Sequence, residues 1–343
     1  MKRYVLNCLR QVKSTLARIE EHIVVLDANE VPSAAIDKLS ILGKLNLLDI
    51  NHPSKREEVK KHIKKATVLW VALGQKIDED LLKCAPNLTD VVSVTTGSLH
   101  VDLDYLQEKG INFHFLRGED KFLEKLSATA EHTWALLLGL QRKIFPSYQD
   151  VINGEWRRDG FRGRELADQT LGIIGVGRLG RKVASYGNVF GMNVIGYDRD
   201  PKKIPDYISM VSSVKDLIVN SDVISIHIHA TPENYKLLSK EMLSYLKPDA
   251  CLINTSRGEI IDEIELVNLL KMKKISGYGA DVVDNELAEK KNPLREYAIS
   301  APKNLLLTPH IGGFTTESRL KAEIFMAEKL VDIKLKSQPN PLR

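Results

Sequence analysis

The sequence GVGRLG at 175–180 spaces three glycines as G-x-G-x-x-G. It directly follows a β-rich apolar run at 170–174 and opens a helical pattern from Arg181 to Phe190. A second apolar run then ends in Asp198, 21 positions after Gly177. This order of strand, glycine turn, helix, strand and acidic residue is the fingerprint of a Rossmann-type dinucleotide-binding unit.

Each part of the fingerprint has a physical role. Gly175 permits a tight turn, Gly177 lets the backbone approach a pyrophosphate, and Gly180 lets helix and strand pack closely. The helix N-terminus offers unpaired N–H groups and a partial positive charge to the phosphates. Asp198 can accept hydrogen bonds from ribose hydroxyls and would repel a 2′-phosphate, so the sequence predicts NAD as the cofactor. The neighbouring Arg199 leaves the strictness of that preference open.

The rest of the chain alternates short apolar runs with helical patterns, which predicts an α/β fold built on parallel sheets. A chain of 343 residues exceeds one ordinary core, so two domains are expected. Helical patterns at 125–143 and 316–335 predict a buried helix bridging the domains and a C-terminal helix that returns to the first domain. The predicted strands lie at 23–27, 45–50, 67–73, 90–95, 111–116, 170–176, 192–198, 223–229, 250–255, 276–283 and 304–308.

Composition excludes several classes of partner. The net charge of +4 comes from 49 basic and 45 acidic residues spread widely, which predicts neither nucleic acid nor a membrane as partner. The three cysteines are scattered, so we expect no disulfide framework, no metal site and a reducing, cytoplasmic location. The first 22 residues are basic, with no acid before Glu20. They loosely resemble a transit peptide, but we favour a short amphipathic extension.

The segment NTSRGEIID at 254–262 places Arg257 between a predicted strand end and the next helix. Asp262 is predicted to cap that helix, with Glu265 completing a capping box. Ligands bind at the carboxyl edge of open α/β sheets, where an arginine could hold a carboxylate with two parallel hydrogen bonds. A salt bridge to a nearby acid is the alternative, and this segment alone does not separate the two.

Two further segments follow predicted strand ends, TPHIGG at 308–313 and DVVDNE at 281–286. His310 in the first can donate or accept a proton near neutral pH. An acid of the second segment could hydrogen-bond that imidazole and hold it in place. An arginine, a glutamate and a histidine after strand ends of one nucleotide domain form a constellation typical of a dehydrogenase.

These motifs give the chain a strong resemblance to the D-isomer-specific 2-hydroxyacid dehydrogenase family over about residues 23–335. The resemblance also rests on VTTGSLHVD at 94–102, AEHTWALLL at 130–138 and HIHATPE from 227. It implies that Arg257 binds the carboxylate and carbonyl of a 2-oxo or 2-hydroxy acid, and that His310, paired with Glu286, is the general acid/base. The implied NAD-binding residues are Gly175, Gly177, Arg178, Leu179, Gly180, Asp198, Thr231, Thr255 and Asp281. The implied substrate loop comprises Thr96, Gly97, Ser98 and Leu99, through its backbone N–H groups.

The same resemblance implies a discontinuous layout. Residues 1–124 plus 314–343 would form a flavodoxin-like substrate domain and 125–313 an NAD-binding Rossmann domain, with a cleft between them. It also implies a homodimer paired through the nucleotide domains. Transcriptional corepressors resemble this family too, so an NAD(H)-sensing binding protein with little turnover is the alternative function.

The chain departs from the family pattern at several places. Leu287 replaces the usual proline after the acid, and the loop at 117–125 is unusually charged, with Lys125 where phosphoglycerate enzymes have an asparagine. Ala72 and Leu73 fall where those enzymes bind phosphate, and the nearby Gln75 and Lys76 could serve differently. These differences argue against 3-phosphoglycerate, and the sequence leaves the substrate open.

Overall fold

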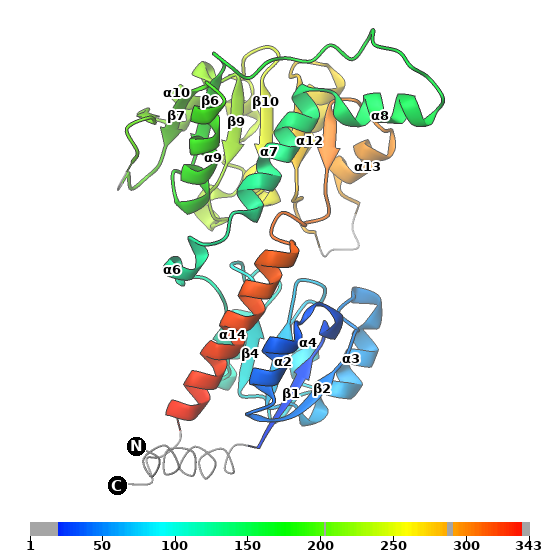
Figure 1. The fold of residues 1–343 in the computed structure, drawn as a ribbon, viewed down its shortest axis with the longest axis vertical. Coiled ribbons are helices and arrows are strands. Elements are labelled where there is room, and N and C mark those ends of the chain that lie inside the picture. The colour runs from blue at the N-terminus through cyan, green and yellow to red at the C-terminus, as the bar shows by residue number, and fades with distance from the viewer. Residues whose placement is uncertain (1–19, 202–203, 287–290, 338–343) are drawn as a thin grey trace, which may run out of the picture. The chain divides into compact units, whose positions relative to one another are not determined.

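The chain divides into two compact units, each built on one parallel sheet (Figure 1). The computed structural model describes residues 20–201, 204–286 and 291–337. Unit 1 comprises Met1–Leu123 and Thr316–Arg343, and unit 2 comprises Glu124–Thr315. The predicted fold class, two α/β parallel-sheet domains, is therefore confirmed. The part of the chain described here contains no helix long and apolar enough to cross a membrane.

Unit 1 has a five-stranded sheet in the order β2-β1-β3-β4-β5. The C-terminal helix α14 packs against α2 within this unit. Its strands are β1 (Glu21–Val25), β2 (Gly43–Leu47), β3 (Val68–Val71), β4 (Asp90–Ser93) and β5 (Asn112–His114). Its helices are α2 (Ser33–Leu39), α3 (Arg56–His62), α4 (Glu79–Leu82), α5 (Leu103–Lys109), α6 (Asp120–Leu123) and α14 (Thr316–Lys336), with 3-10 turns η1 (Ala28–Glu30), η2 (Pro53–Lys55) and η3 (Ile63–Lys65).

Unit 2 has a seven-stranded sheet in the order β12-β11-β10-β9-β6-β7-β8. Its strands are β6 (Thr170–Ile174), β7 (Asn193–Tyr197), β8 (Ser209–Met210), β9 (Val223–Ile226), β10 (Cys251–Asn254), β11 (Gly277–Ala280) and β12 (Leu305–Leu307). Its helices are α7 (Ala128–Gln141), α8 (Ile144–Ile152), α9 (Arg178–Val189), α10 (Val214–Asn220), α11 (Lys240–Leu243), α12 (Glu263–Lys271) and α13 (Pro293–Ile299), with 3-10 turns η4 (Pro232–Asn234) and η5 (Gly258–Ile260).

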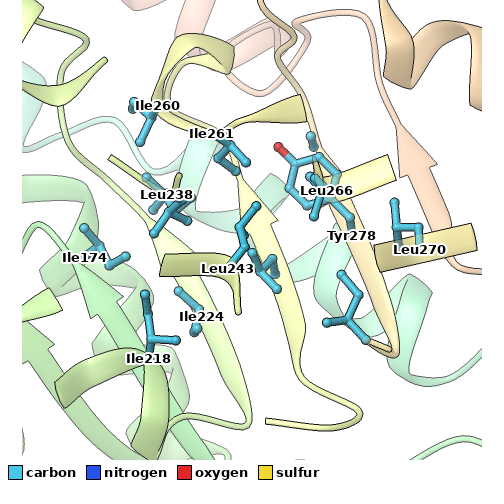
Figure 2. Packing of buried hydrophobic residues seen from close by; sticks show 14 of the residues in the cluster. Ile174, Ile218, Ile224, Leu238, Leu243, Ile260, Ile261, Leu266, Leu270 and Tyr278 are labelled. Atoms are coloured by element: carbon cyan, nitrogen blue, oxygen red, sulfur yellow. The ribbon is translucent and has the colours of Figure 1, made fainter. Parts of the chain in front are cut away.

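Helices cover both faces of the unit 2 sheet, which explains why its strands β9, β10 and β11 are buried along their whole length. In β10, Leu252 belongs to the core under α10, α11 and α12, whereas Cys251 and Ile253 belong to the core under α7 and α9. Successive strand side chains point to opposite faces, so both faces must be apolar when both are covered. Figure 2 shows the first of these cores, in which Ile260 and Ile261 anchor the segment that follows β10.

All the predicted strands overlap observed ones, but each was drawn too long at its carboxyl end, and β1 and β2 begin two residues earlier than predicted. The two-residue edge strand β8 was missed because both its residues are exposed and carry no apolar pattern. The prediction of a helix bridging the domains was wrong, because α7 lies wholly within unit 2. Of the basic stretch 1–22, residues 1–19 lie outside the described residues, and His22 already belongs to β1.

Candidate active site

Parallel pairing brings the carboxyl ends of the unit 2 strands to one edge of the sheet. Three neighbouring strands, β10, β11 and β12, lead into the segments that carry Arg257, Glu286 and His310. Strand β6 leads into the glycine turn at Gly175, and its neighbour β7 leads into Asp198. This edge is where open α/β sheets bind ligands.

His310 and Glu286 form a direct pair. Nδ1 of His310 lies 2.6 Å from Oε2 of Glu286, and the two side chains are 26% and 29% exposed. The carboxylate therefore occupies one ring nitrogen and leaves Nε2 for another partner. This is the arrangement in which a carboxylate fixes the orientation of a catalytic imidazole.

The backbone of His310 is held in the left-handed region, with φ of 57°. A residue other than glycine is uncommon there and persists when its surroundings impose it. The N–H of His310 donates to the carbonyl oxygen of Asp281 at 2.9 Å. The Asp281 carboxylate accepts from the N–H groups of Ile311 at 2.8 Å and Gly312 at 2.6 Å. A Cβ at Gly312 would lie 2.8 Å from that carboxylate, so the turn requires glycine.

Asp281 is 2% exposed, and its carboxylate accepts hydrogen bonds from other residues of unit 2. Besides the two N–H groups, its Oδ1 accepts from the Thr308 hydroxyl at 2.6 Å and lies 3.4 Å from Nε2 of His132. Burial raises the pKa of Asp281, but the hydrogen bonds from His132, Thr308 and the turn outweigh it, so its pKa is lowered. Asp281 thus stays ionised and organises the His310 turn.

Arg257 lies on a turn that packs against the segment carrying Glu286. A Cβ at Gly258 would lie 2.0 Å from the carbonyl carbon of Val283, so only glycine allows this approach. The turn is closed by Asn254, whose side-chain amide donates to the Arg257 carbonyl at 2.9 Å. Burial raises the pKa of Glu259, which the charge of Arg257 opposes and that of Glu286 reinforces. Arg257 and Glu286 therefore lie within electrostatic range of the same carboxyl group.

The glycines of the GVGRLG turn differ in whether the fold itself requires a glycine. Gly175 has φ of 91°, and a Cβ at Gly180 would lie 2.0 Å from the Gly175 carbonyl oxygen. Gly177, by contrast, has φ of −73°, and a Cβ there would meet no atom within 4 Å. Nothing in the described protein explains a glycine at this helix N-terminus. The open space fits the close approach of a dinucleotide phosphate.

The other predicted cofactor residues surround this turn. Oδ2 of Asp198 accepts from the Val176 N–H at 2.8 Å, so the acid is fixed at the start of the glycine turn. The Arg178 guanidinium donates to the Leu126 carbonyl at 3.3 Å, and Leu179 packs on the core under α9. Thr231 precedes η4 after β9. Thr255 is buried after β10, its hydroxyl 2.8 Å from that of Thr133.

The predicted substrate loop belongs to unit 1, where it follows β4. Its four N–H groups, those of Thr96, Gly97, Ser98 and Leu99, donate no hydrogen bond to any residue that the structure describes. The Thr95 hydroxyl donates to the Gly97 carbonyl at 2.8 Å and so braces the loop. Free backbone donors of this kind suit an anion such as a carboxylate.

Some expectations for individual residues were wrong or lie beyond the described chain. Gln75 is 1% exposed, and its amide donates to the carbonyl of Ile50 at 3.3 Å and to that of His52, so it serves the core of unit 1. Glu265 does not complete a capping box, because its carboxylate pairs with Lys240 at 3.0 Å. Leu287 lies outside the described residues.

Sequence reasoning missed two residues that reach the Glu286 segment. Glu263 accepts from the Asp284 N–H at 2.7 Å and Asn292 donates to the Asp284 carbonyl at 3.2 Å. Neither residue stands in a motif, and both contacts depend on how α12 and α13 pack. Only the position of Glu263 directly after the Asp262 cap could have drawn attention to it.

Comparison with known proteins agrees with this geometry. Residues 134–312 match the family model described as D-isomer specific 2-hydroxyacid dehydrogenase, NAD binding domain. A glyoxylate reductase of Aeropyrum pernix is 33% identical over 316 residues, which are 90% of this chain and 91% of that protein. A D-3-phosphoglycerate dehydrogenase of Methanocaldococcus jannaschii is 32% identical over 297 residues, which are 86% of this chain but 55% of that protein.

A solved structure extends the similarity to both units. The D-lactate dehydrogenase from Aquifex aeolicus, complexed with NAD and lactic acid, superposes with a TM-score of 0.72 at 29% identity. The match covers 91% of this chain and 93% of that one. Given this coverage and the motifs above, the chain belongs to the D-isomer-specific 2-hydroxyacid dehydrogenase family and is an NAD-dependent oxidoreductase that interconverts 2-oxo acids and D-2-hydroxy acids.

Proposed function

We propose that Arg257, Glu286 and His310 carry the reaction on a small 2-oxo acid. The observation that carries this proposal is the 2.6 Å contact between His310, in the segment after β12, and Glu286, in the segment after β11. Strand β11 lies next to β10, which leads to Arg257. The guanidinium of Arg257 binds the substrate carboxylate and polarises the adjacent carbonyl. When bound, the nicotinamide cofactor supplies the hydride.

His310 transfers the proton. In the reducing direction its free Nε2 donates a proton to the carbonyl oxygen of the substrate, and in the oxidising direction it accepts the proton of the hydroxyl. Glu286 stabilises the imidazolium through Nδ1 and keeps the ring in one orientation. Proton transfer of this kind contributes on the order of 10²–10⁴-fold to the rate.

We propose further that Gly175, Gly177, Gly180 and the N–H groups of Arg178 and Leu179 bind the pyrophosphate, and that Asp198 binds the ribose. The open space at Gly177 supports this assignment. Thr231, Thr255 and Asp281 are proposed to line the rest of the cofactor site. For Asp281 the support is its place beside the His310 turn, since its carboxylate is already occupied.

We propose that loop 96–99 helps to bind the substrate carboxylate, supported by its free N–H groups. Glyoxylate is the first substrate to test, because the glyoxylate reductase matches this chain over 91% of its own length. Ala72 and Leu73 offer no charge for a phosphate, which disfavours phosphorylated acids.

The decisive experiment is NADH consumption with a panel of 2-oxo acids. The panel contains glyoxylate, pyruvate, hydroxypyruvate and branched-chain, aromatic, phosphorylated and sugar-derived acids. With the best substrate, His310→Ala and Arg257→Ala should each reduce kcat/KM by about 10³-fold or more while NADH binding stays within a few-fold of wild type. Turnover near the wild-type level in either variant would refute the assignment.

We also propose a homodimer paired through unit 2. Helix α8 and the residue four positions beyond it expose large apolar side chains that a partner subunit would cover. These are Ile144, Phe145, Tyr148, Val151, Ile152 and Trp156. Light scattering should give twice the chain mass, and Phe145→Asp should yield a monomer.

A further inference from the structure

Glu263 is a buried carboxylate that has no part in the reaction proposed above. It is the first residue of α12 and is 5% exposed. Both of its oxygens are occupied by one neighbouring segment. Oε1 accepts from the Asp284 N–H at 2.7 Å, and Oε2 accepts from Nδ2 of Asn292 at 2.5 Å. The carboxylate thus fastens two points of the chain that lie on either side of Glu286.

Asn292 also binds Asp284 directly. Its Nδ2 also donates to the Asp284 carbonyl at 3.2 Å, so Asp284 is held through both its N–H and its carbonyl. Its Oδ1 accepts from the N–H groups of Leu294 at 3.0 Å and Arg295 at 3.1 Å, which caps α13. Glu286 follows two residues after Asp284, beyond Asn285 with its left-handed backbone, φ 54°.

The N-terminus of α12, where Glu263 lies, is also close in sequence to the turn that carries Arg257. Gly258 packs directly on the backbone of Val283 and Asp284, and four residues separate it from Glu263. Between them, Ile260 and Ile261 are each 1% exposed in the core shown in Figure 2. The positions of both Arg257 and Glu286 therefore depend on one rigid, buried region.

A carboxylate offers an acceptor to each of the two donors at this place, which a neutral amide does not. Two N–H donors converge on it, and only a carboxylate offers both oxygens as acceptors. A glutamine would present its NH2 group to one of the donors and leave that donor unsatisfied. Burial raises the pKa of Glu263 to about 7, so an acid here carries a cost in stability that an apolar residue would avoid.

We propose that Glu263 is a positioning residue, which holds Asp284 and Asn292 in place so that Glu286 meets Nδ1 of His310. This inference rests on the roles proposed for Glu286 and His310. Glu263 is buried at the start of α12 and is not proposed to touch the substrate or the cofactor. It acts through Glu286 by fixing the backbone on which that side chain stands.

The test compares Glu263→Gln with Glu265→Gln, the same change on the same helix at a residue whose carboxylate pairs with Lys240 on the surface. For each variant we would measure kcat, KM, NADH affinity, thermal unfolding and the pH profile of kcat/KM. Glu263→Gln should lower kcat by about 10–100-fold, because small misplacements of catalytic groups cost this much. It should move the pH profile in the same direction as Glu286→Gln, with NADH affinity unchanged. Glu265→Gln should match wild type throughout.

A double mutant separates a positioning role from a general loss of stability. If Glu263 acts through Glu286, the variant carrying both glutamines should be no more than about two-fold slower than Glu286→Gln alone. Multiplicative losses, or a wild-type pH profile in Glu263→Gln, would overturn the inference. If Glu286→Gln itself leaves the pH profile unchanged, the proposed role of Glu286 fails instead. If Glu263→Gln does not fold, Asn292→Ser takes its place in the test. Serine retains an oxygen that can cap α13 but lacks the Nδ2 group that binds Glu263, so this variant should shift the pH profile in the same direction.

Discussion

Nδ1 of His310 lies 2.6 Å from Oε2 of Glu286, on segments that follow two neighbouring strands of one sheet. The pair is maintained from both sides. Asp281 holds the left-handed turn of His310, and Glu263 with Asn292 holds the backbone of Asp284, two residues before Glu286. The contact is therefore a property of the folded backbone and does not depend on a chance meeting of two surface side chains.

Replacing Glu286 with glutamine should change the pH dependence of the reaction. The amide keeps a hydrogen-bonding group beside His310 but no longer stabilises a positive imidazolium. In the reducing direction, the pH above which kcat/KM falls should move down by about one unit or more. The measurement is kcat/KM from pH 5 to 10, with Glu286→Asp as the variant that retains charge. An unchanged profile would argue against the pairing in solution.

Two glycines of the cofactor turn should respond in opposite ways to the same substitution. Gly177→Ala places a methyl group in open space at an ordinary backbone angle, so the free protein should keep its Tm. Its Kd for NADH should rise by about tenfold or more, because the methyl occupies the approach of the pyrophosphate. Gly180→Ala meets the Gly175 carbonyl at 2.0 Å and should lower Tm by several degrees. Calorimetry and NADH titration distinguish the two outcomes.

Asp198→Asn should weaken the preference for NADH over NADPH. The amide can still accept the Val176 N–H, so the turn is preserved, but the negative charge that repels a 2′-phosphate is lost. The ratio of kcat/KM for NADH to that for NADPH should fall by about tenfold. A ratio equal to that of the wild-type protein would mean that another residue determines the preference for NADH over NADPH.

The stability of the protein should fall as pH rises across the range set by Glu323. This side chain is fully buried, accepts from Trp70 Nε1 at 2.9 Å and lies 2.6 Å from Arg319. Burial raises its pKa from 4.5 to about 7, although Arg319 opposes the shift. Between these values the unfolded chain releases the proton first, so ionisation favours unfolding. The free energy of unfolding should therefore decrease by on the order of 2 kcal/mol from pH 4.5 to 7 through this group.

Glu323→Gln isolates that contribution, because the amide still accepts from Trp70 but does not titrate. Urea unfolding of both proteins at several pH values gives the difference. Glu263, whose pKa is also raised by burial, lies in unit 2, acts equally in both proteins and cancels. Asp27 shares Arg319 with Glu323, so its titration belongs to the difference that is measured. A difference independent of pH would contradict the assignment.

The sequence predicted which residues follow the strand ends better than it predicted the contacts that hold those residues in place. Strand ends could be located because strands covered on both faces are apolar throughout, and the residues after them must meet at one edge. His310, Arg257 and Asp198 were found for this reason. Glu263, Asn292 and His132 were not, because each reaches its partner across a packing arrangement that no local pattern encodes.

The same limit explains the errors. Glu265 has the spacing of a capping box, but Lys240 on α11 offers its carboxylate a charged partner. The sequence around Gln75 predicts an accessible loop, but the Gln75 side chain is buried and donates to the backbone carbonyls of Ile50 and His52. In each case a contact from another element overrides the local signal.

The hydrogen bond between Trp70 and Glu323 joins residues 253 positions apart and lies within unit 1. Unit 2 is inserted between them as one continuous stretch. During synthesis, the ribosome releases all of unit 2 before α14 emerges, so unit 2 can complete its core while unit 1 still lacks a helix. Until α14 is made, α2 lacks the helix that packs against it. Premature termination within α14 would therefore damage the first-made part of the chain while sparing the middle.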